Sequence, residues 1–281
     1  MSRERVLQQR LRSLGTLEEA VGALRTLSAQ HFRAARAPLA AVRTYRDEVH
    51  RFLGVLHTSG TEPARGGPTG IVLIAADLGL VGDYTTRLVR ESLALRAESG
   101  PGPLVCLGRR AVAPLARAGV EPVSVQPAPT SVAGLTSLLI PLVDTILSLR
   151  RTGELGSLWL VAARFEGAGE YSPVRVPVLP VPVPTGLPPL ASSPYSDVET
   201  LRTVVIREYL YVSLYETLLE ALASEHGKRL VTAESARLWL EERISGTRRL
   251  ATAIRREAST QELLEVIVAA RAARREAGGI S

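Results

Sequence analysis

The sequence has very little cysteine, lysine or aromatic side chain. Its 281 residues include one cysteine, Cys106, and one lysine, Lys228, and aromatic residues make up only 4% of the chain. A single cysteine excludes an internal disulfide and a multi-cysteine zinc site, and it is typical of a protein from a reducing, cytoplasmic compartment. The scarcity of aromatic rings argues against a stacking platform for single-stranded nucleic acid.

Positive charge is in excess, and nearly all of it is arginine. Lysine and arginine together number 34 against 28 acidic residues, which gives a net charge of +6. This balance is compatible with nucleic acid, anionic lipid or an acidic protein face as a partner, and it does not choose among them. With 46% apolar and 22% charged residues, the composition predicts a folded chain with a substantial core. The first 13 residues are charged throughout and lack the apolar stretch of a secretory signal.

One apolar segment, 131–149, is long enough to cross a bilayer. It contains Pro141 and Asp144, which both fit poorly in an isolated membrane span. Its large apolar residues recur every three or four positions. This spacing favours a buried helix that covers a sheet.

The chain divides into three parts by the pattern of its residues. Residues 1–57 have a helical pattern, 70–190 alternate short apolar runs with helical stretches, and 198–277 form a second long helical region. Segments 58–70 and 184–197, which are rich in glycine, proline and serine, read as the loops between them.

The first region keeps a seven-residue frame. One set of core positions in that frame is Leu7, Leu14, Val21, Ser28, Ala35, Val42, Val49 and Leu56. The second set is Leu11, Glu18, Arg25, Phe32, Leu39, Arg46 and Leu53. Most members are apolar, which predicts a helix with one packed face. Pro38 is expected to kink this helix or split it in two.

The last region shows a similar spacing from His226 through Leu240, Ile244 and Ile254 to Val268. A helix of about 50 residues is roughly 75 Å long, whereas a compact globule of this chain length is only about 50 Å across. Such a helix must project, and a projecting apolar stripe needs a partner. The two terminal regions can supply it for each other, so the sequence predicts an antiparallel coiled coil.

The middle region reads as α/β. The apolar run 70–77 predicts a strand that is buried on both faces. Further strands are expected at 103–108, 121–127 and 157–163, with helices at 83–98, 109–118 and 130–150 between them. The segment 172–183 alternates but carries four prolines, which predicts an edge position. A small, mostly parallel sheet follows.

Signals for catalysis or cofactor binding are weak. The turn after the first strand spaces Gly79 and Gly82 as GxxG and not as a dinucleotide or phosphate-loop motif, and Asp83 is expected to cap the next helix and repel an anion. His50 and His57 are two turns apart without further ligands, and Cys106 sits in an apolar strand. We therefore expect no catalytic residue, no cofactor and no metal.

Arginines cluster on both long helical regions. They are Arg10, Arg12, Arg25, Arg33 and Arg36 in the first, and Arg243, Arg248, Arg249, Arg255, Arg256, Arg271, Arg274 and Arg275 in the last. One interpretation is a solvated basic face. The other is bidentate pairing with carboxylates of a surrounding protein.

Three segments, in the right order, resemble the gamma subunit of rotary F-type ATP synthases. RLRSLGTLEEAVGALRTLSAQHFRAA (10–35) is similar to the family's opening helix, and AADLGLVGDYTT (75–86) is similar to its SDRGLCGxYN segment. ASEHGKRLVTAESA (223–236) resembles ASExxxRMxAMxxA, and TAIRREASTQELLEVIVAA (252–270) resembles YNxxRQxxITxELxEIxxGA. Lysines and methionines of the family are replaced in the first segment, and Arg256 stands where glutamine is usual. The chain resembles a divergent branch.

The resemblance implies a non-catalytic shaft of the central stalk, with an antiparallel coiled coil and a Rossmann-like base, that couples ion flow to ATP synthesis or hydrolysis. Implied partners are alpha- and beta-type ATPase subunits, an epsilon-type small subunit and a membrane rotor ring of c-type subunits, at the cytoplasmic face of the inner membrane. Neither nucleic acid nor a direct membrane span is implied. By match to the family, the residues that contact the catalytic ring are Arg10, Arg12, Arg25, Arg33, Asp77, Gly79, Gly82, Arg255, Arg256, Thr260, Gln261 and Glu262.

Two other interpretations stay open at this point. One is a stand-alone α/β binding module or nucleotide-dependent enzyme with helical arms for dimerisation. The other is a basic coil that binds nucleic acid.

Overall fold

The computed structural model describes residues 3–56, 66–167, 169–182, 184, 187 and 197–278, with side chains up to residue 271. Two compact units form: Met1–Arg25 with Ala233–Ser281, and Thr26–Thr232. His57, the expected loop 58–70 as far as residue 65, and most of the expected loop 184–197 lie outside the described residues.

The unit Thr26–Thr232 is built on one five-stranded sheet in the order β3-β2-β1-β4-β5. The strands are β1 (Thr69–Ile74), β2 (Leu104–Leu107), β3 (Ser124–Gln126), β4 (Ser157–Gly167) and β5 (Glu170–Leu179). The first four are parallel, and β5 runs antiparallel to β4 at the edge. Pro173 and Pro177 lie opposite Ala163 and Trp159 of β4, and an edge strand tolerates their missing N–H groups. The mostly parallel sheet and the edge position are confirmed.

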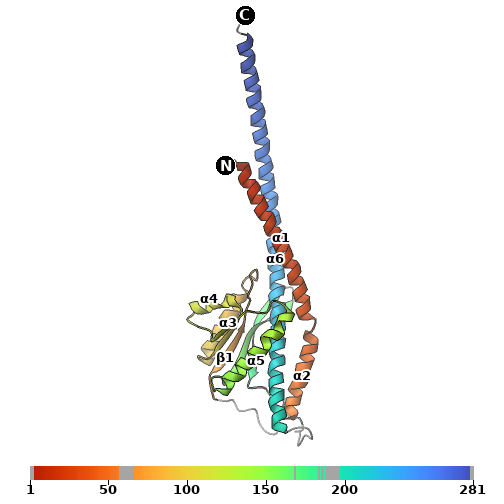
Figure 1. Ribbon diagram of the computed structural model, residues 1–281, viewed down its shortest axis with the longest axis vertical. Coiled ribbons are helices and arrows are strands. Elements are labelled where there is room, and N and C mark those ends of the chain that lie inside the picture. Colours follow the sequence, from red (N-terminus) through yellow and green to blue (C-terminus); the bar gives the residue numbers. More distant parts are fainter. Residues whose placement is uncertain are drawn as a thin grey trace. The chain divides into compact units, whose positions relative to one another are not determined.

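Both faces of the sheet are covered. Ile71 and Leu73 of β1 pack under α3 (Tyr84–Ser99) and α4 (Val112–Arg117), and α4 follows a single 3-10 turn, Arg109–Ala111. Val72 and Ile74 face the opposite way, into a core shared with three further helices (Figure 1). These are α2 (Leu39–Val55), α5 (Leu135–Arg151) and the first part of α6 (Val198–Gly278). The uninterrupted apolar run of β1 thus supplies two cores.

Helix α5 belongs to the segment Val132–Arg151, which is long and apolar enough to cross a membrane by length and composition alone. One of its faces, with Leu135, Leu139 and Leu142, is buried in the core. On the outer side Ile140 is exposed, and Asp144 accepts a hydrogen bond from Arg207 of α6 at 3.1 Å. The structure therefore uses α5 as a helix that covers a sheet, as its spacing predicts.

The N-terminal helical region is divided at Pro38. Helix α1 (Arg3–Arg36) ends just before Ala37 and Pro38, and α2 begins at Leu39. Proline has no N–H to donate and its ring clashes with the preceding turn, so the helix breaks here. The first set of core positions in the seven-residue frame, from Leu7 to Leu56, is buried or half-buried throughout.

In the other unit, α1 and α6 pack antiparallel. Leu14 of α1 is buried with Leu240 and Ile244 of α6. Ion pairs join Arg25 to Glu234, and Glu4 to Arg255, each at 2.9 Å. The earlier residue on α1 therefore meets the later residue on α6, which confirms the antiparallel coiled coil.

The predicted length of the packed apolar face on α6 is wrong. It was expected to reach Val268, but every side chain described from residue 255 to 271 is exposed. Helix α1 begins at Arg3, and Glu4 already lies beside Arg255. The end of α6 therefore continues without α1 alongside it, which Figure 1 shows in blue.

Gly108 offers a test of the sheet geometry. It follows β2 with φ +103, and a Cβ atom there would lie 2.4 Å from the carbonyl oxygen of Ala75. Gly119 also has a positive φ of +71, but a Cβ there meets nothing within 4 Å. We expect Gly108→Ala to lower the free energy of unfolding by about 2–4 kcal/mol more than Gly119→Ala in urea titrations. Equal losses would contradict this close approach.

Candidate functional site

The turn after β1, residues 77–83, has a strained backbone. Leu80 has a φ of +58 and Gly82 a φ of +56. Glycine adopts this left-handed conformation readily, whereas leucine does so at a cost. Leu78 and Leu80 are exposed. The turn thus exposes two apolar side chains to solvent. Contacts from Arg109 and from Arg229 of α6 hold its backbone in place.

Asp77 holds one end of this turn. Its carboxylate accepts hydrogen bonds from the backbone N–H of Arg109 at 2.9 Å and from Nη2 of Arg109 at 2.6 Å. These bonds from Arg109 lower the pKa of Asp77. Only 5% of the Asp77 side chain is exposed. Asp77 thus connects the end of β1 to the segment that follows β2. The sequence pattern did not predict that Arg109 is its partner.

Arg229 of α6 holds the middle of the turn. This arginine is fully buried, and its Nε donates to the carbonyl oxygen of Gly79 at 3.1 Å. Its Nη2 pairs with Glu225 one helical turn earlier, and its Nη1 donates to Nδ1 of His226 at 3.1 Å. We call Glu225, His226 and Arg229, with the carbonyls of Gly79 and Thr130, the buried joint.

His226 completes the buried joint as a neutral side chain. Its Nδ1 accepts from Arg229, so Nε2 carries the proton and donates to the carbonyl oxygen of Thr130 at 3.1 Å. Burial, and then the charge of Arg229, lower the pKa of His226 to about 4. Burial raises the pKa of Glu225, against the opposing attraction of Arg229. Removal of one partner from such a pair typically costs about 3–5 kcal/mol, because the other charge is left buried alone.

The joint accounts for the most specific motif in the sequence. Ala223 and Ser224 are also fully buried, and the Ser224 hydroxyl donates to the carbonyl oxygen of Ala163 in β4 at 3.3 Å. The motif that resembles ASExxxR is therefore internal: its residues lock α6 onto the sheet and the turn 77–83.

The contacts of Arg109 and Arg229 with the turn 77–83 also concern nucleotide binding, for which the sequence shows no motif. In open α/β sheets a ligand sits outside the carboxyl ends of the strands. At β1 that place holds Arg109 and Arg229, both bonded to the turn. Asp83 lies at the N-cap position of α3 as expected, but the expected capping bond is wrong, because its side chain makes no capping hydrogen bond to α3. Its carboxylate instead accepts from the Tyr171 hydroxyl at 3.2 Å.

Other candidate groups for catalysis are occupied or inert. Burial raises the pKa of Cys106 to about 11. The His31 ring stacks on His226 with 5.0 Å between centroids, and His50 Nε2 donates to the carbonyl oxygen of Pro182 at 2.6 Å. Within the described residues, no group of three histidine, cysteine, aspartate or glutamate side chains is placed to hold a metal ion.

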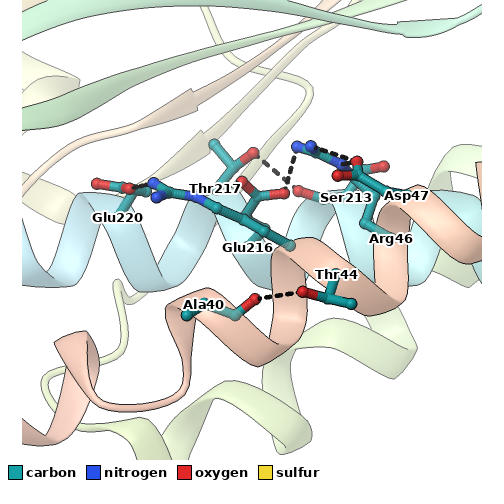
Figure 2. Close-up of polar contacts among 9 residues, drawn as sticks. Ala40, Thr44, Arg46, Asp47, Ser213, Glu216, Thr217 and Glu220 are labelled. Carbon is teal, nitrogen blue, oxygen red and sulfur yellow. Dashed lines mark hydrogen bonds and ion pairs between the residues drawn. The ribbon is translucent and has the colours of Figure 1, made fainter.

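The sequence did not predict a charged cluster that lies between α2 and α6. Arg46 pairs with Glu216 at 2.5 Å, and Arg43 pairs with Glu216 at 3.2 Å and with Glu220 (Figure 2). These residues line a cavity of about 410 Å³ against β4 and β5. The available signal was the spacing of three between the arginines and four between the glutamates, which puts each pair on one helix face.

The residues expected to contact a ring fall into both units. Arg33 is exposed in the last turn of α1 and belongs, with the turn 77–83, to Thr26–Thr232. The other expected contacts belong to the unit that pairs α1 with α6. There Arg25 is bonded to Glu234, and Arg255 to Glu4.

The remaining expected contacts are all exposed on the helices of that second unit. They are Arg10, Arg12, Arg256, Thr260, Gln261 and Glu262. The Thr260 hydroxyl donates to its own helix, at the carbonyl oxygen of Arg256 (2.9 Å). The structure thus brings Asp77, Gly79 and Gly82 into one bonded turn and spreads the others along the surfaces of two helices.

The buried joint predicts a pH dependence of stability. Between pH about 6.5 and 4 the unfolded chain binds a proton on His226 that the folded chain does not. The free energy of unfolding should therefore fall as the pH drops through this window, by about 3 kcal/mol from this group. His226→Gln should remove this part of the loss in urea titrations at pH 7 and pH 4. His50→Gln is the control. The prediction would be refuted if the free energy of unfolding fell by the same amount from pH 7 to pH 4 in the unaltered chain and in both variants.

Comparisons with known proteins give a consistent result. The family model described as ATP synthase matches residues 3–273. The ATP synthase gamma chain of Moorella thermoacetica is 28% identical, over 96% of this chain and 99% of its own length. The gamma chain of Symbiobacterium thermophilum is 27% identical, over 96% and 98%.

Solved structures share the fold. One covers the central stalk and c-ring of the Tetrahymena thermophila mitochondrial ATP synthase, with a TM-score of 0.56 and 18% identity over 77% of this chain and 99% of that chain. Another comes from the OSCP/F1/c-ring structure of the Euglena gracilis enzyme, with a TM-score of 0.61 and 13% identity over 96% and 94%. The chain therefore belongs to the ATP synthase family, and within it to the gamma chains.

Proposed function

We propose that this gamma chain works as a shaft that performs no bond chemistry of its own. ATP is made or hydrolysed in partner subunits of alpha and beta type that surround the shaft, and the rotation of the shaft couples those sites to ion flow. The charged groups of the buried joint are bonded to one another and to the backbone, and this supports a structural role for the strongest motif of the chain.

One observation carries the proposal. Helix α6 runs without a break for 81 residues, which corresponds to roughly 120 Å. Helix α1 packs against it through a thin seam of apolar residues, and α6 then continues with exposed side chains. A long, slender helix pair with a bare end suits a rod that is enclosed by other subunits.

A shaft can control catalysis through contact free energy alone. Each subunit of a surrounding ring meets a different face of an asymmetric rod. A contact that is stronger in one conformation of that subunit shifts its equilibrium by the difference in affinity. Identical catalytic sites then adopt different states at the same moment, and rotation of the rod exchanges these states.

The exposed arginines are the proposed contacts with the ring. Arg10, Arg12 and Arg256 are exposed, so their guanidinium groups can reach acidic side chains in bidentate fashion. Arg25 and Arg255 already hold carboxylates within the helix pair, so a ring would compete for them. Thr260, Gln261 and Glu262 lie on the bare end of α6 and are proposed to contact the ring as well.

The turn 77–83 and Arg33 are the proposed contacts on the sheet-containing unit. Leu78 and Leu80 are the exposed apolar side chains that this turn offers. Asp77, Gly79 and Gly82 act as positioning residues, because they fix the backbone that presents the two leucines.

The α/β region, expected at 70–190, is the proposed seat for an epsilon-type subunit and for a membrane rotor ring of c-type subunits. The helical regions 1–57 and 198–277 are the proposed rod. The complex would then lie at the cytoplasmic face of the inner membrane, with this chain as a peripheral part. The structurally similar central stalk from Tetrahymena thermophila, which was solved with its c-ring, supports the seat for a rotor ring.

Recovery of partners from the host tests the proposal directly. The tagged full chain should co-purify with alpha- and beta-type ATPase subunits in a complex that hydrolyses ATP, while the chain alone should not. A stable homodimer that binds a dinucleotide, with neither subunit recovered, would favour the binding-module interpretation. Retention on DNA that falls steeply with salt would favour the nucleic-acid interpretation.

Charge reversal tests the ring contacts. The double change Arg255→Glu and Arg256→Glu should weaken assembly of the chain with the ring about tenfold or more while the helical content stays the same, because two potential carboxylate partners become repulsive. Glu4→Gln is the matched control, since it breaks the Glu4–Arg255 pair but keeps both arginines. Assembly should be read by sedimentation. Equal assembly of the double variant and the control would contradict the contact.

A helix break tests the role as a rod. Ala251 lies half-buried on α6, and Ala251→Pro removes a helix hydrogen bond at a cost of about 3 kcal/mol or more. In the assembled complex we expect ATP hydrolysis to remain measurable and ATP-driven ion pumping to be lost. Ala251→Ser, which keeps the helix, should pump normally. Normal pumping by the proline variant would show that the rod is not needed intact.

A further inference from the structure

A cavity of about 410 Å³ lies between α2, α6 and the paired strands β4 and β5, inside the unit Thr26–Thr232. We call it the Glu220 cavity. Its volume falls within the range of small-molecule sites, roughly 300–1,000 Å³. It exceeds the room that one or two bridging waters need, at about 30 Å³ each. The proposed function of the chain makes no use of this cavity.

Glu220 brings an unsatisfied acceptor to the cavity. Only 10% of its side chain is exposed, and its Oε1 pairs with Arg43. Its Oε2 is buried, and among the described residues it has no hydrogen-bond partner. Glu216, one turn earlier, also lines the cavity but has both oxygens bonded, to Arg43 and to Arg46. A buried carboxylate oxygen without a donor is unfavourable, so a donor from outside the chain would complete this site.

Two hydroxyl groups on the same face of α6 accompany this oxygen. Ser213 and Thr217 line the cavity and are both buried. Their spacing of four and three residues places them in a row with Glu220 (Figure 2). The Thr217 hydroxyl donates to the carbonyl oxygen of Ser213 at 2.8 Å, so its own oxygen can still accept. An ammonium group has three N–H donors and no acceptor, and these three oxygens match it.

An arginine marks the solvent side of the cavity. Arg164 of β4 lines the cavity and is exposed. In the described part of the chain no ion pair joins Arg164 to a carboxylate, whereas Arg175 of the neighbouring strand β5 holds Glu91 and Glu98. A guanidinium group binds a carboxylate in bidentate fashion. The cavity therefore offers acceptors at its buried side and a cation at its exposed side.

The strand side of the cavity is apolar. Ala163 of β4 and Val174 and Val176 of β5 line it, and none of these side chains can form a hydrogen bond. The carbon skeleton of an organic molecule gains free energy by packing on such a wall. A hydrated inorganic ion would gain nothing from this contact, so the wall favours an organic ligand.

We propose that the Glu220 cavity binds a small zwitterion, a molecule of amino-acid size with an ammonium group at one end and a carboxylate at the other. The ammonium group donates to Oε2 of Glu220 and to the hydroxyl oxygens of Ser213 and Thr217. The carboxylate pairs with Arg164. A bound zwitterion joins α6 to β4 and stabilises the folded unit by mass action. The proposal is independent of the proposed function, because binding is a property of this chain alone.

Other occupants match only part of the cavity. A diamine would place its second ammonium group beside Arg164, and like charges repel. A dicarboxylate would place its second carboxylate beside Glu216 and Glu220, which are acidic as well. Water fits any polar wall but gains nothing from the valines, and it does not distinguish one added solute from another.

Probes with chains of four carbon atoms separate these occupants. Isothermal titration calorimetry on the full chain at pH 7 compares γ-aminobutyrate with putrescine and succinate, and it includes glycine and β-alanine as shorter zwitterions. At least one zwitterion should bind at least tenfold more tightly than putrescine and succinate. The proposal would be overturned if none of the three zwitterions bound at millimolar concentration, as in a cavity that holds only water, or if putrescine or succinate bound as tightly.

A charge series at Arg164 tests the recognition of the carboxylate. Arg164→Gln should bring the affinities for the zwitterion and for putrescine to about the same value. Arg164→Glu should invert the preference, because a carboxylate at the solvent side then attracts the second ammonium group of putrescine. Arg164 is exposed, so both variants should keep the circular dichroism spectrum of the unaltered chain. An unchanged preference in the two variants would overturn the assignment.

Filling the cavity provides an independent test. Val174→Phe places a larger side chain against the cavity and should weaken binding of the best zwitterion at least tenfold. Val125→Phe is the matched control, since Val125 lies in the other edge strand, β3, and does not line the cavity. If urea titration shows that Val174→Phe is unfolded, Glu220→Gln replaces it, because it keeps the size of the side chain and should also weaken binding at least tenfold. Binding equal to that of Val125→Phe would refute the site.

Discussion

A single buried guanidinium organises the sheet-containing unit. Arg229 has no access to water, so every donor it carries toward Glu225, His226 and Gly79 substitutes for lost hydration. The need to satisfy these hydrogen bonds fixes the position of α6 along its axis relative to the end of β1, and it fixes the shape of the turn 77–83. Such pairs add little net stability, but they penalise any other register heavily. The joint thus sets one position of α6 on the sheet.

The paired helices are held by much weaker forces. Their buried apolar cluster consists of Leu14, Leu240 and Ile244, and the ion pairs at Arg25 and Arg255 are solvent-exposed. Exposed pairs contribute at most about 1 kcal/mol each. By comparison, the two cores around the sheet bury dozens of side chains. Enclosure by other subunits would therefore supply much of the order of this part of the chain.

Patterns of period two and seven predicted most of the fold, because burial repeats along a strand or a helix. The heptad frame located the packed face of the N-terminal helical region, the uninterrupted apolar run located β1, and proline chemistry located the edge strand β5 and the break at Pro38. Contacts between charges that are distant in the sequence have no period. The sequence patterns therefore predicted neither the partner of Asp77 nor the charged cluster of Arg43 and Arg46 with Glu216. Asp83 was assigned as a cap because the hydroxyl of Tyr171, 88 residues away, leaves no local signal. The extent of the packed stripe on α6 was overestimated, since a heptad in one helix does not reveal where the other helix starts.

The uncovered end of α6 has a mechanical consequence. Up to Arg255 two helices share any bending load, and beyond it one helix carries the load alone. Flexural stiffness rises steeply with cross-section, so this tip is the most compliant stretch of the pair. A flexible end of α6 can adjust its position inside a surrounding ring that is not perfectly symmetric. The paired helices α1 and α6 behind it are stiffer and can transmit torque with little elastic twist.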